Sequence, residues 1–177
     1  YKNAAQMYST FQAVVTVEEP EESKRREQIN NILEDMEFEA WIYSPDTPVN
    51  YPVMQYQDNQ YYLNHLPDGT INGSGSIFID YKNKFDFTDD NSILYGHHMN
   101  NGSMFAELKK YKTTAYYESH PFFYLYTKER IYKIELFSGY IIDATTSLPI
   151  KFGDGERDMF IKQVKEQSLF QSKVTIS

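Results

Sequence analysis

Hydrophobic and polar positions follow two different rhythms, a helical one before residue 38 and a strand-like one after it. Ile29, Ile32, Leu33 and Met36 recur at helical spacing with charged residues between them. Because an acidic, proline-containing start precedes them, the pattern predicts a helix from about Glu21 to Met36, after a shorter helical stretch. Residues 1–38 are therefore expected to form a helical segment that packs on a domain made of residues 39–177.

From residue 41 onward, short apolar runs alternate with turn signals, which is typical of β-strands. The expected strands are Trp41–Tyr43, Tyr51–Gln55, Gly75–Asp80, Ser92–His97, Phe122–Tyr126, Arg130–Ile142 and Lys173–Ser177. Helices are expected in the connections, one capped by Ser103 and one over Arg157–Phe170. Many short strands with a few helices between them predict a mainly β fold, a closed β-barrel with helical insertions.

Composition supports a sheet-rich fold and excludes several functions. The chain has 16 Tyr, 12 Phe and one Trp, residues that suit half-buried strands. Its net charge of −8 argues against a nucleic-acid partner and leaves no polybasic patch for anionic lipid. The absence of cysteine excludes disulfides and thiolate metal sites within these residues. We expect no cofactor.

The four histidines are the first candidates for chemistry. Two of them, His97 and His98, directly follow an apolar run and Gly96. Neighbouring residues of a strand point to opposite faces, so this pair cannot readily hold one metal ion. A strand end that opens into a loop is where catalytic groups tend to lie. From the residues alone, His97 is either catalytic or an ordinary hydrogen-bonded histidine.

Two acidic clusters are the other candidates. They are Asp86, Asp89 and Asp90, and Asp154, Glu156 and Asp158. Neither follows the EF-hand spacing, and the second precedes the expected last helix, where acids stabilise the helix N-terminus. Calcium binding stays open as an alternative at each cluster.

Several motifs, in order along the chain, resemble class B sortases. They are Tyr51-Pro52-Val53-Met54-Gln55, Asp58-Asn59-Gln60-Tyr61-Tyr62-Leu63-Asn64-His65, Gly75-Ser76-Ile77-Phe78-Ile79-Asp80, Ile93-Leu94-Tyr95-Gly96-His97-His98-Met99 and Gly102-Ser103-Met104-Phe105. The resemblance runs from about Trp41 to the last residue. It implies an eight-stranded β-barrel, incomplete in this chain, with N-terminal helices and an extra helix between the sixth and seventh strands, where Arg157–Phe170 falls.

The resemblance also implies a site. His97 matches the family's catalytic histidine, and Asn59, Leu63, Tyr95 and Ser177 match positions near its substrate groove. Residues 145–152 match the mobile wall of that groove in placement only.

The nucleophile of the resembled family lies outside these residues. Thr175-Ile176-Ser177 is similar to the start of the Thr-Leu-Ser-Thr-Cys-like motif that ends the seventh strand, with Ile for Leu. The catalytic cysteine and the arginine of the eighth strand are therefore expected beyond Ser177. The 177-residue chain is expected to be inactive alone.

The implied activity is that of a cysteine transpeptidase. Such an enzyme attacks a Thr–Gly bond in the C-terminal sorting signal of a surface protein and passes the thioester to an amine of a peptidoglycan stem or cross-bridge. His97 would protonate the leaving amine. The implied location is the extracellular face of a Gram-positive-type membrane, reached through an N-terminal anchor absent from this chain. The alternative is a non-catalytic, sortase-like surface binding module, and the residue two beyond Ser177 distinguishes the two.

Overall fold

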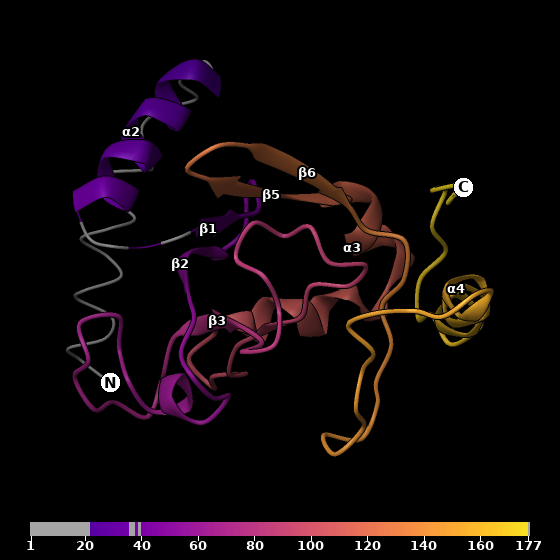
Figure 1. The fold of residues 1–177 in the computed structure, drawn as a ribbon. Helices are drawn as coiled ribbons and strands as arrows, with labels where there is room; N and C mark the ends of the chain where they lie inside the picture. The colour runs from indigo at the N-terminus through magenta and orange to yellow at the C-terminus, as the bar shows by residue number, and fades with distance from the viewer. Residues whose placement is uncertain (1–21, 36–37, 39, 177) are drawn as a thin grey trace.

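The computed structural model describes residues 22–35, 38 and 40–176 (Figure 1). The elements are α2 (Glu22–Asp35), β1 (Ala40–Tyr43), β2 (Asn50–Met54), the 3-10 helix η1 (Tyr61–Leu63), β3 (Ile77–Ile79), β4 (Leu94–Tyr95), the 3-10 helix η2 (Phe105–Lys112), α3 (Thr114–Ser119), β5 (Phe122–Thr127), β6 (Ile131–Glu135) and α4 (Glu156–Glu166). The short helical stretch expected before α2 lies outside the described residues.

The strands form one curled sheet in the order β4-β3-β2-β1-β5-β6. All neighbouring strands are antiparallel except β2 and β3, which are parallel. The sheet is a half-barrel that has β4 and β6 at its two ends, with α2 beside one part of it and α4 at the opposite side of the molecule (Figure 1). The expectation of a mainly β fold with helical insertions is confirmed.

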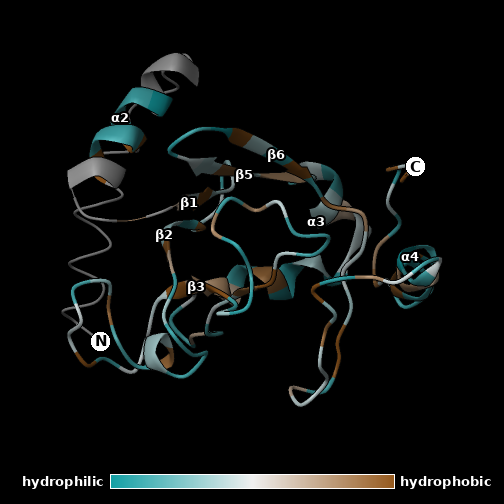
Figure 2. Cartoon of the chain, viewed as in Figure 1, coloured by the Kyte–Doolittle hydropathy of each residue, from teal (hydrophilic) through white to brown (hydrophobic). Residues whose placement is uncertain are grey.

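The central strands β1, β2 and β3 are buried on both faces, which explains why they are so largely apolar. Strand alternation sends Ala40 and Ile42 of β1 to one core and Trp41 to the other. Ile77 and Ile79 of β3 likewise face the first core, while Phe78 faces the second. Hydrophobic residues accordingly concentrate in the strands, and polar ones in the loops around them (Figure 2).

Helix α2 covers the second of these cores. Ile29 is fully buried and Ile32 is buried, and both belong to the cluster that contains Trp41 and Tyr126. The helix contacts β1 and β5. Leu33 and Met36, the other two residues of the expected apolar face, lie outside the described side chains. Full burial of an isoleucine side chain contributes about 1.5–3 kcal/mol.

Two of the expected strands, Lys173–Ser177 and Arg130–Ile142, differ most from the structure. Residues 173–176 form no strand and pair with no strand of the sheet, β4 included. Their contacts are with helices instead: Lys173 Nζ lies 3.5 Å from Glu118 Oε1 of α3, and Lys165 Nζ of α4 donates to the Val174 carbonyl over 3.3 Å. Ser177 lies outside the described residues.

The strand expected over Arg130–Ile142 ends at Glu135. Its partner β5 begins with Phe122, which pairs with Glu135, so the ladder runs out at Pro121. The alternation within β6 is as expected, since Tyr132 and Ile134 are half-buried and Lys133 is exposed. The strand expected over Ser92–His97 is also shorter, because only Leu94 and Tyr95 pair with β3.

The helix boundaries also differ from those expected. Ser103 does not cap η2; its hydroxyl donates to Asn101 Oδ1 over 2.6 Å, and Met104 occupies the cap position at φ 59°. The last helix spans Glu156–Glu166 rather than Arg157–Phe170. It stops early because the chain turns toward the segment that follows β6, where the Leu169 N–H donates to the Gly139 carbonyl over 2.7 Å.

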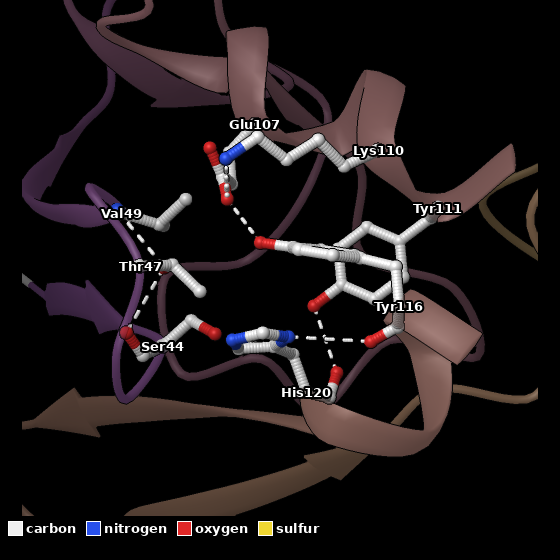
Figure 3. A network of polar contacts seen from close by, with 8 residues as sticks. All are labelled: Ser44, Thr47, Val49, Glu107, Lys110, Tyr111, Tyr116 and His120. Carbon is white, nitrogen blue, oxygen red and sulfur yellow. Dashed lines mark hydrogen bonds and ion pairs between the residues drawn. The ribbon is translucent and has the colours of Figure 1, made fainter. Parts of the chain in front are cut away.

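A buried polar cluster fastens the helical insertion η2–α3. The Glu107 carboxylate accepts hydrogen bonds from the Tyr116 hydroxyl and, over 2.9 Å, from Lys110 Nζ (Figure 3). The Tyr111 hydroxyl donates to the His120 carbonyl over 2.8 Å. Burial raises the pKa of Glu107, but the hydrogen bonds from Tyr116 and Lys110 outweigh burial and lower it overall. The cluster therefore holds a charged carboxylate between η2 and α3.

Candidate functional site

The β3–β4 ladder brings Asp80 and Tyr95 together. Phe78 pairs with Tyr95 across the ladder, and their ring centroids are 5.2 Å apart. Because residues two apart on a strand share a face, Asp80 follows Phe78 on the side that carries Tyr95. The Tyr95 hydroxyl donates to Asp80 Oδ2 over 2.9 Å. Burial, and then the hydrogen bond to Asp80, raise the pKa of Tyr95 to about 12.

Asn59 joins the same carboxylate from a different part of the chain. Its Nδ2 donates to Asp80 Oδ2 over 2.7 Å, and its Oδ1 accepts from the Tyr81 N–H over 3.0 Å. The Lys82 N–H donates to the second oxygen, Asp80 Oδ1, over 2.9 Å. Asp80 is buried, with a side chain 6% exposed. Asn59 and Tyr95, which sequence motifs singled out separately, are therefore neighbours through Asp80.

His97 lies two residues after Tyr95 and contacts the loop that carries Leu63. Its Nε2 is 2.7 Å from the Leu63 carbonyl oxygen. A carbonyl can only accept, so Nε2 carries the proton and donates it. No hydrogen bond to His97 Nδ1 occurs within the part of the chain that the structure describes, which leaves that nitrogen available to another group.

Gly96 allows the backbone between Tyr95 and His97 to lie against the core. A Cβ at this position would stand 2.3 Å from Ile77 Cδ1 and 2.7 Å from Phe105 Cδ2. A side chain at residue 96 would therefore force Ile77 and Phe105 to shift.

His98 has a different environment from His97. It forms an isolated bridge with Met104, its side chain is exposed, and it lines an apolar cavity. The sequence predicted that His97 and His98 point to opposite faces of one strand. This explanation is wrong, because β4 ends at Tyr95 and neither histidine lies in it. The two histidines nevertheless differ, since only His97 contacts the Leu63 loop.

A cavity of about 790 Å³ opens beside β4. Leu94, Tyr95 and Gly96 line one part of it, and the segment 138–142 that follows β6 lines another. The neighbouring loop of residues 145–152 is tied to the start of β4: Asn91 Nδ2 donates to the Pro149 carbonyl over 2.7 Å, and the Phe152 N–H donates to Asp90 Oδ2 over 3.1 Å. The expected groove wall is thus hydrogen-bonded to the segment that leads into β4.

The acidic clusters have local structural roles. Asp89 accepts from Asn83 Nδ2 over 3.0 Å and from the Lys84 N–H over 2.6 Å, and these bonds lower its pKa. Glu156 accepts from the Gly153 N–H over 2.7 Å at the start of α4. Among the described residues, no group of three His, Asp or Glu side chains could hold a metal ion. Nor does any described helix combine the length and hydrophobicity needed to cross a membrane.

Sequence reasoning missed Asp80 as a residue of the site. It ends an apolar run, and a single acid in that position looks like a strand terminus. The available signal was its distance of two residues from Phe78, which places both side chains on one face of the strand. Recognising its partners required the pairing of β3 with β4.

Comparison with known proteins identifies the family. No protein-family model matches the chain. It is 37% identical to sortase B of Listeria monocytogenes over 142 residues, which are 78% of this chain and 57% of that protein. It is 32% identical to sortase B of Staphylococcus aureus over 164 residues, which are 88% of this chain and 66% of that protein.

Solved structures agree with the curated relatives. A Staphylococcus aureus sortase B–substrate complex matches with a TM-score of 0.83 at 28% identity, over 99% of this chain and 82% of that one. A Bacillus anthracis protein described as similar to sortase B matches with a TM-score of 0.83 at 31% identity, over 100% of this chain and 86% of that one. The fold is that of solved sortase B structures. The chain belongs to the sortase B family, and it spans 57% and 66% of the two curated relatives.

Proposed function

We propose that the full-length protein is a class B cysteine transpeptidase that cleaves the Thr–Gly bond of a C-terminal sorting signal. Family membership supports this proposal. The single observation that carries it furthest is the contact of His97 with the Leu63 carbonyl, beside the pair Asn59 and Tyr95. His97 contacts Leu63 directly, and Tyr95 is linked to Asn59 through Asp80. These contacts join two segments of the chain, residues 59–63 and 95–97.

His97 is proposed as the proton donor to the leaving amine. Peptide cleavage needs an acid at the departing nitrogen, because an amide anion is too poor a leaving group. With Nε2–H committed to Leu63, the nitrogen that exchanges a proton with the reacting groups is Nδ1. The Leu63 carbonyl also stabilises an imidazolium, because its oxygen accepts from the ring.

The nucleophile is proposed to be a cysteine two residues after Ser177 in the full-length protein. The 177 residues contain no cysteine, so a thiolate must come from elsewhere in the protein. A cysteine thiolate attacks the carbonyl and forms a thioester, and a peptidoglycan amine then resolves it. An arginine further along is proposed to stabilise the tetrahedral oxyanion.

The proposed substrates and location follow from the same assignment. The partners are the sorting-signal peptide of a surface protein and an amine of the peptidoglycan stem or cross-bridge. A structural neighbour was solved as a substrate complex, which supports a peptide partner for this chain. The proposed location is the outer face of a Gram-positive-type cell membrane, with an N-terminal anchor in the full-length protein.

The test is incubation of the full-length extracellular domain with a library of sorting-signal peptides. We expect cleavage between Thr and Gly for a subset of peptides, and transfer to an added amine. The gene sequence supplies an independent check, because the second codon after that for Ser177 should encode cysteine. Another residue at that position, together with no cleavage of any peptide, would instead favour a non-catalytic binding module.

A further inference from the structure

Asp80 is the one buried carboxylate of the candidate site, and the proposed chemistry does not use it. Two side-chain donors from different segments, Asn59 Nδ2 and the Tyr95 hydroxyl, converge on the same oxygen, Oδ2. The ion pairs between described residues do not include Asp80. A buried carboxylate is costly unless hydrogen bonds stabilise it, so three donors on a side chain 6% exposed indicate a specific task.

We propose that Asp80 is a positioning residue that sets the hydrogen-bonding roles of Asn59 and Tyr95 toward a peptide unit of the substrate. This inference rests on the proposed function, and it adds a residue and a chemical role to it. Asp80 does not touch substrate in this account; it acts through its two neighbours.

Asn59 is held in one amide orientation. Its Oδ1 already accepts from the Tyr81 N–H, and one hydrogen of its Nδ2 goes to Asp80. An asparagine amide has two N–H donors. One donor therefore remains without an acceptor among the described residues, and the side chain cannot flip to present its oxygen instead.

Tyr95, in contrast, is left able only to accept a hydrogen bond from a ligand. A phenol hydroxyl has one hydrogen, and that hydrogen is donated to Asp80 Oδ2. Only the oxygen lone pairs remain for a ligand, so Tyr95 can accept but not donate. Its raised pKa, about 12, means that the hydroxyl keeps this proton throughout the neutral range.

The remaining N–H of Asn59 and the hydroxyl oxygen of Tyr95 give one donor and one acceptor next to the same carboxylate oxygen. This pair is complementary to the hydrogen-bonding groups of a peptide backbone. A peptide unit offers a C=O that accepts and an N–H that donates. The Asn59 amide would bind a carbonyl of the substrate, and the Tyr95 oxygen would bind an N–H. Recognition through the main chain holds an extended peptide in register without requiring particular side chains at these positions.

Hydrogen bonds also hold the main chain around Asp80 in place. Gln55 Nε2 donates to the carbonyls of Asp80 and Asn83 over 2.9 Å and 2.8 Å. The Asp80 N–H donates to the Ile93 carbonyl over 2.9 Å. The carboxylate is thus placed by a rigid main chain, as a positioning group must be.

The test compares Asp80→Asn with Asp89→Asn in the full-length protein. An asparagine has one oxygen, so at residue 80 either the pair Asn59 and Tyr95 or the Lys82 N–H would face an N–H₂ group. Asp89 holds the same β3–β4 loop through Asn83 and Lys84 and touches neither Asn59 nor Tyr95, which makes it a matched control. Folding of both variants is checked by near-UV circular dichroism.

Two measurements are made on each protein. The first is peptide-cleavage kinetics: Asp80→Asn should raise KM for the sorting peptide at least about tenfold, the loss expected for one hydrogen bond in the site, with a smaller change in kcat, and Asp89→Asn should change neither by more than about twofold. The second is the titration of Tyr95 by NMR of ring-¹³C-labelled tyrosine, assigned through Tyr95→Phe. Its pKa should fall toward 10 in Asp80→Asn and stay raised in Asp89→Asn.

The outcomes separate this inference from the proposed function. If the wild type transfers no peptide, the proposed function fails, and the Tyr95 titration still decides whether Asp80 holds the hydroxyl proton. An active wild type with an unchanged KM in Asp80→Asn overturns the inference alone. If Asp80→Asn does not fold, a wild-type Tyr95 pKa near 10 still overturns the inference, because such a value is incompatible with a buried hydroxyl that donates to Asp80.

Discussion

Tyr95, Gly96 and His97 are consecutive residues, and three different constraints act on them. Tyr95 donates to a buried carboxylate, Gly96 lies against two core side chains, and His97 donates to a loop carbonyl. Strand β4 ends at Tyr95, which pairs with Phe78, so Gly96 and His97 lie in the loop that follows the strand. Each constraint gives a distinct prediction.

Replacement of the two histidines should have unequal effects on the full-length enzyme. We expect His97→Ala to lower the rate of peptide transfer by at least about 10²–10⁴-fold, because the leaving amine loses its acid. His98→Ala should cost far less, since His98 is exposed and only bridges to Met104. The measurement is peptide cleavage and amine transfer, with circular dichroism as the folding control. A dead His98→Ala and an active His97→Ala would reverse the assignment.

Gly96→Ala should destabilise the fold by about 1–3 kcal/mol, because the added methyl group overlaps Ile77 and Phe105. Urea denaturation of the 177-residue chain measures this loss. The matched variant is Gly96→Ala combined with Ile77→Val, which deletes the Cδ1 atom that would lie 2.3 Å from the new methyl carbon. The double variant should lose less than the sum of the single losses. Strict additivity would show that the close approach of Ile77 and Gly96 is not the cause.

At the scale of elements, the sequence predicted most segments but misjudged their ends. Apolar runs located the first six strands, because most of their apolar residues belong to the two cores or pack against them, and they also located the last helix. Ends depend on partners that are distant in sequence: β6 stops where Pro121 interrupts its neighbour, and α4 stops where Gly139 accepts from Leu169. No local pattern contains that information.

Helix α2 should be an integral part of the domain. Ile29→Ala is expected to lower the free energy of unfolding by about 2–5 kcal/mol, because Ile29 is fully buried against the core that contains Trp41. Glu27→Ala on the exposed side of the same helix should change it by less than about 0.5 kcal/mol. Urea denaturation measures both. Equal, small effects would mean that the helix is only an appendage to the sheet.

The Glu107 cluster should make stability depend on pH in the acid range. The pKa of Glu107 is lowered below its usual 4.5 in the folded state, so its contribution is present above about pH 4.5 and is lost as pH falls through the folded value. Glu107→Gln should therefore cost about 1–3 kcal/mol at pH 7 and progressively less at lower pH.

Urea denaturation of the Glu107 variant at pH 7 and pH 3 makes this comparison. Lys110→Met is the matched control, and it should cost at most about 1 kcal/mol, because the Lys110 side chain is 59% exposed. A Glu107→Gln loss that does not change between the two pH values would contradict the account of the cluster.

At the scale of the whole molecule, the family and half-barrel could be predicted from the sequence, whereas the connections within the site could not. Motif order along the chain carried the resemblance, and His97, Asn59, Leu63 and Tyr95 were named from it. That Asp80 joins Asn59 to Tyr95 depends on the pairing of β3 with β4, which brings together residues far apart in the chain. The expected strand Lys173–Ser177 is wrong over residues 173–176, which pair with no strand and instead contact Glu118 of α3 and Lys165 of α4.

The most direct test of the central claim is intact-mass spectrometry of the full-length protein incubated with a sorting-signal peptide, without and then with an acceptor amine. We predict release of the peptide fragment that begins with glycine and an enzyme adduct whose mass corresponds to the enzyme acylated by the remaining peptide through the carbonyl of its threonine; this adduct should disappear when the amine is added. The 177-residue chain, which contains no cysteine, should form no adduct and release no product. Peptide cleavage by the 177-residue chain alone, or the absence of both adduct and product from the full-length protein, would contradict the account.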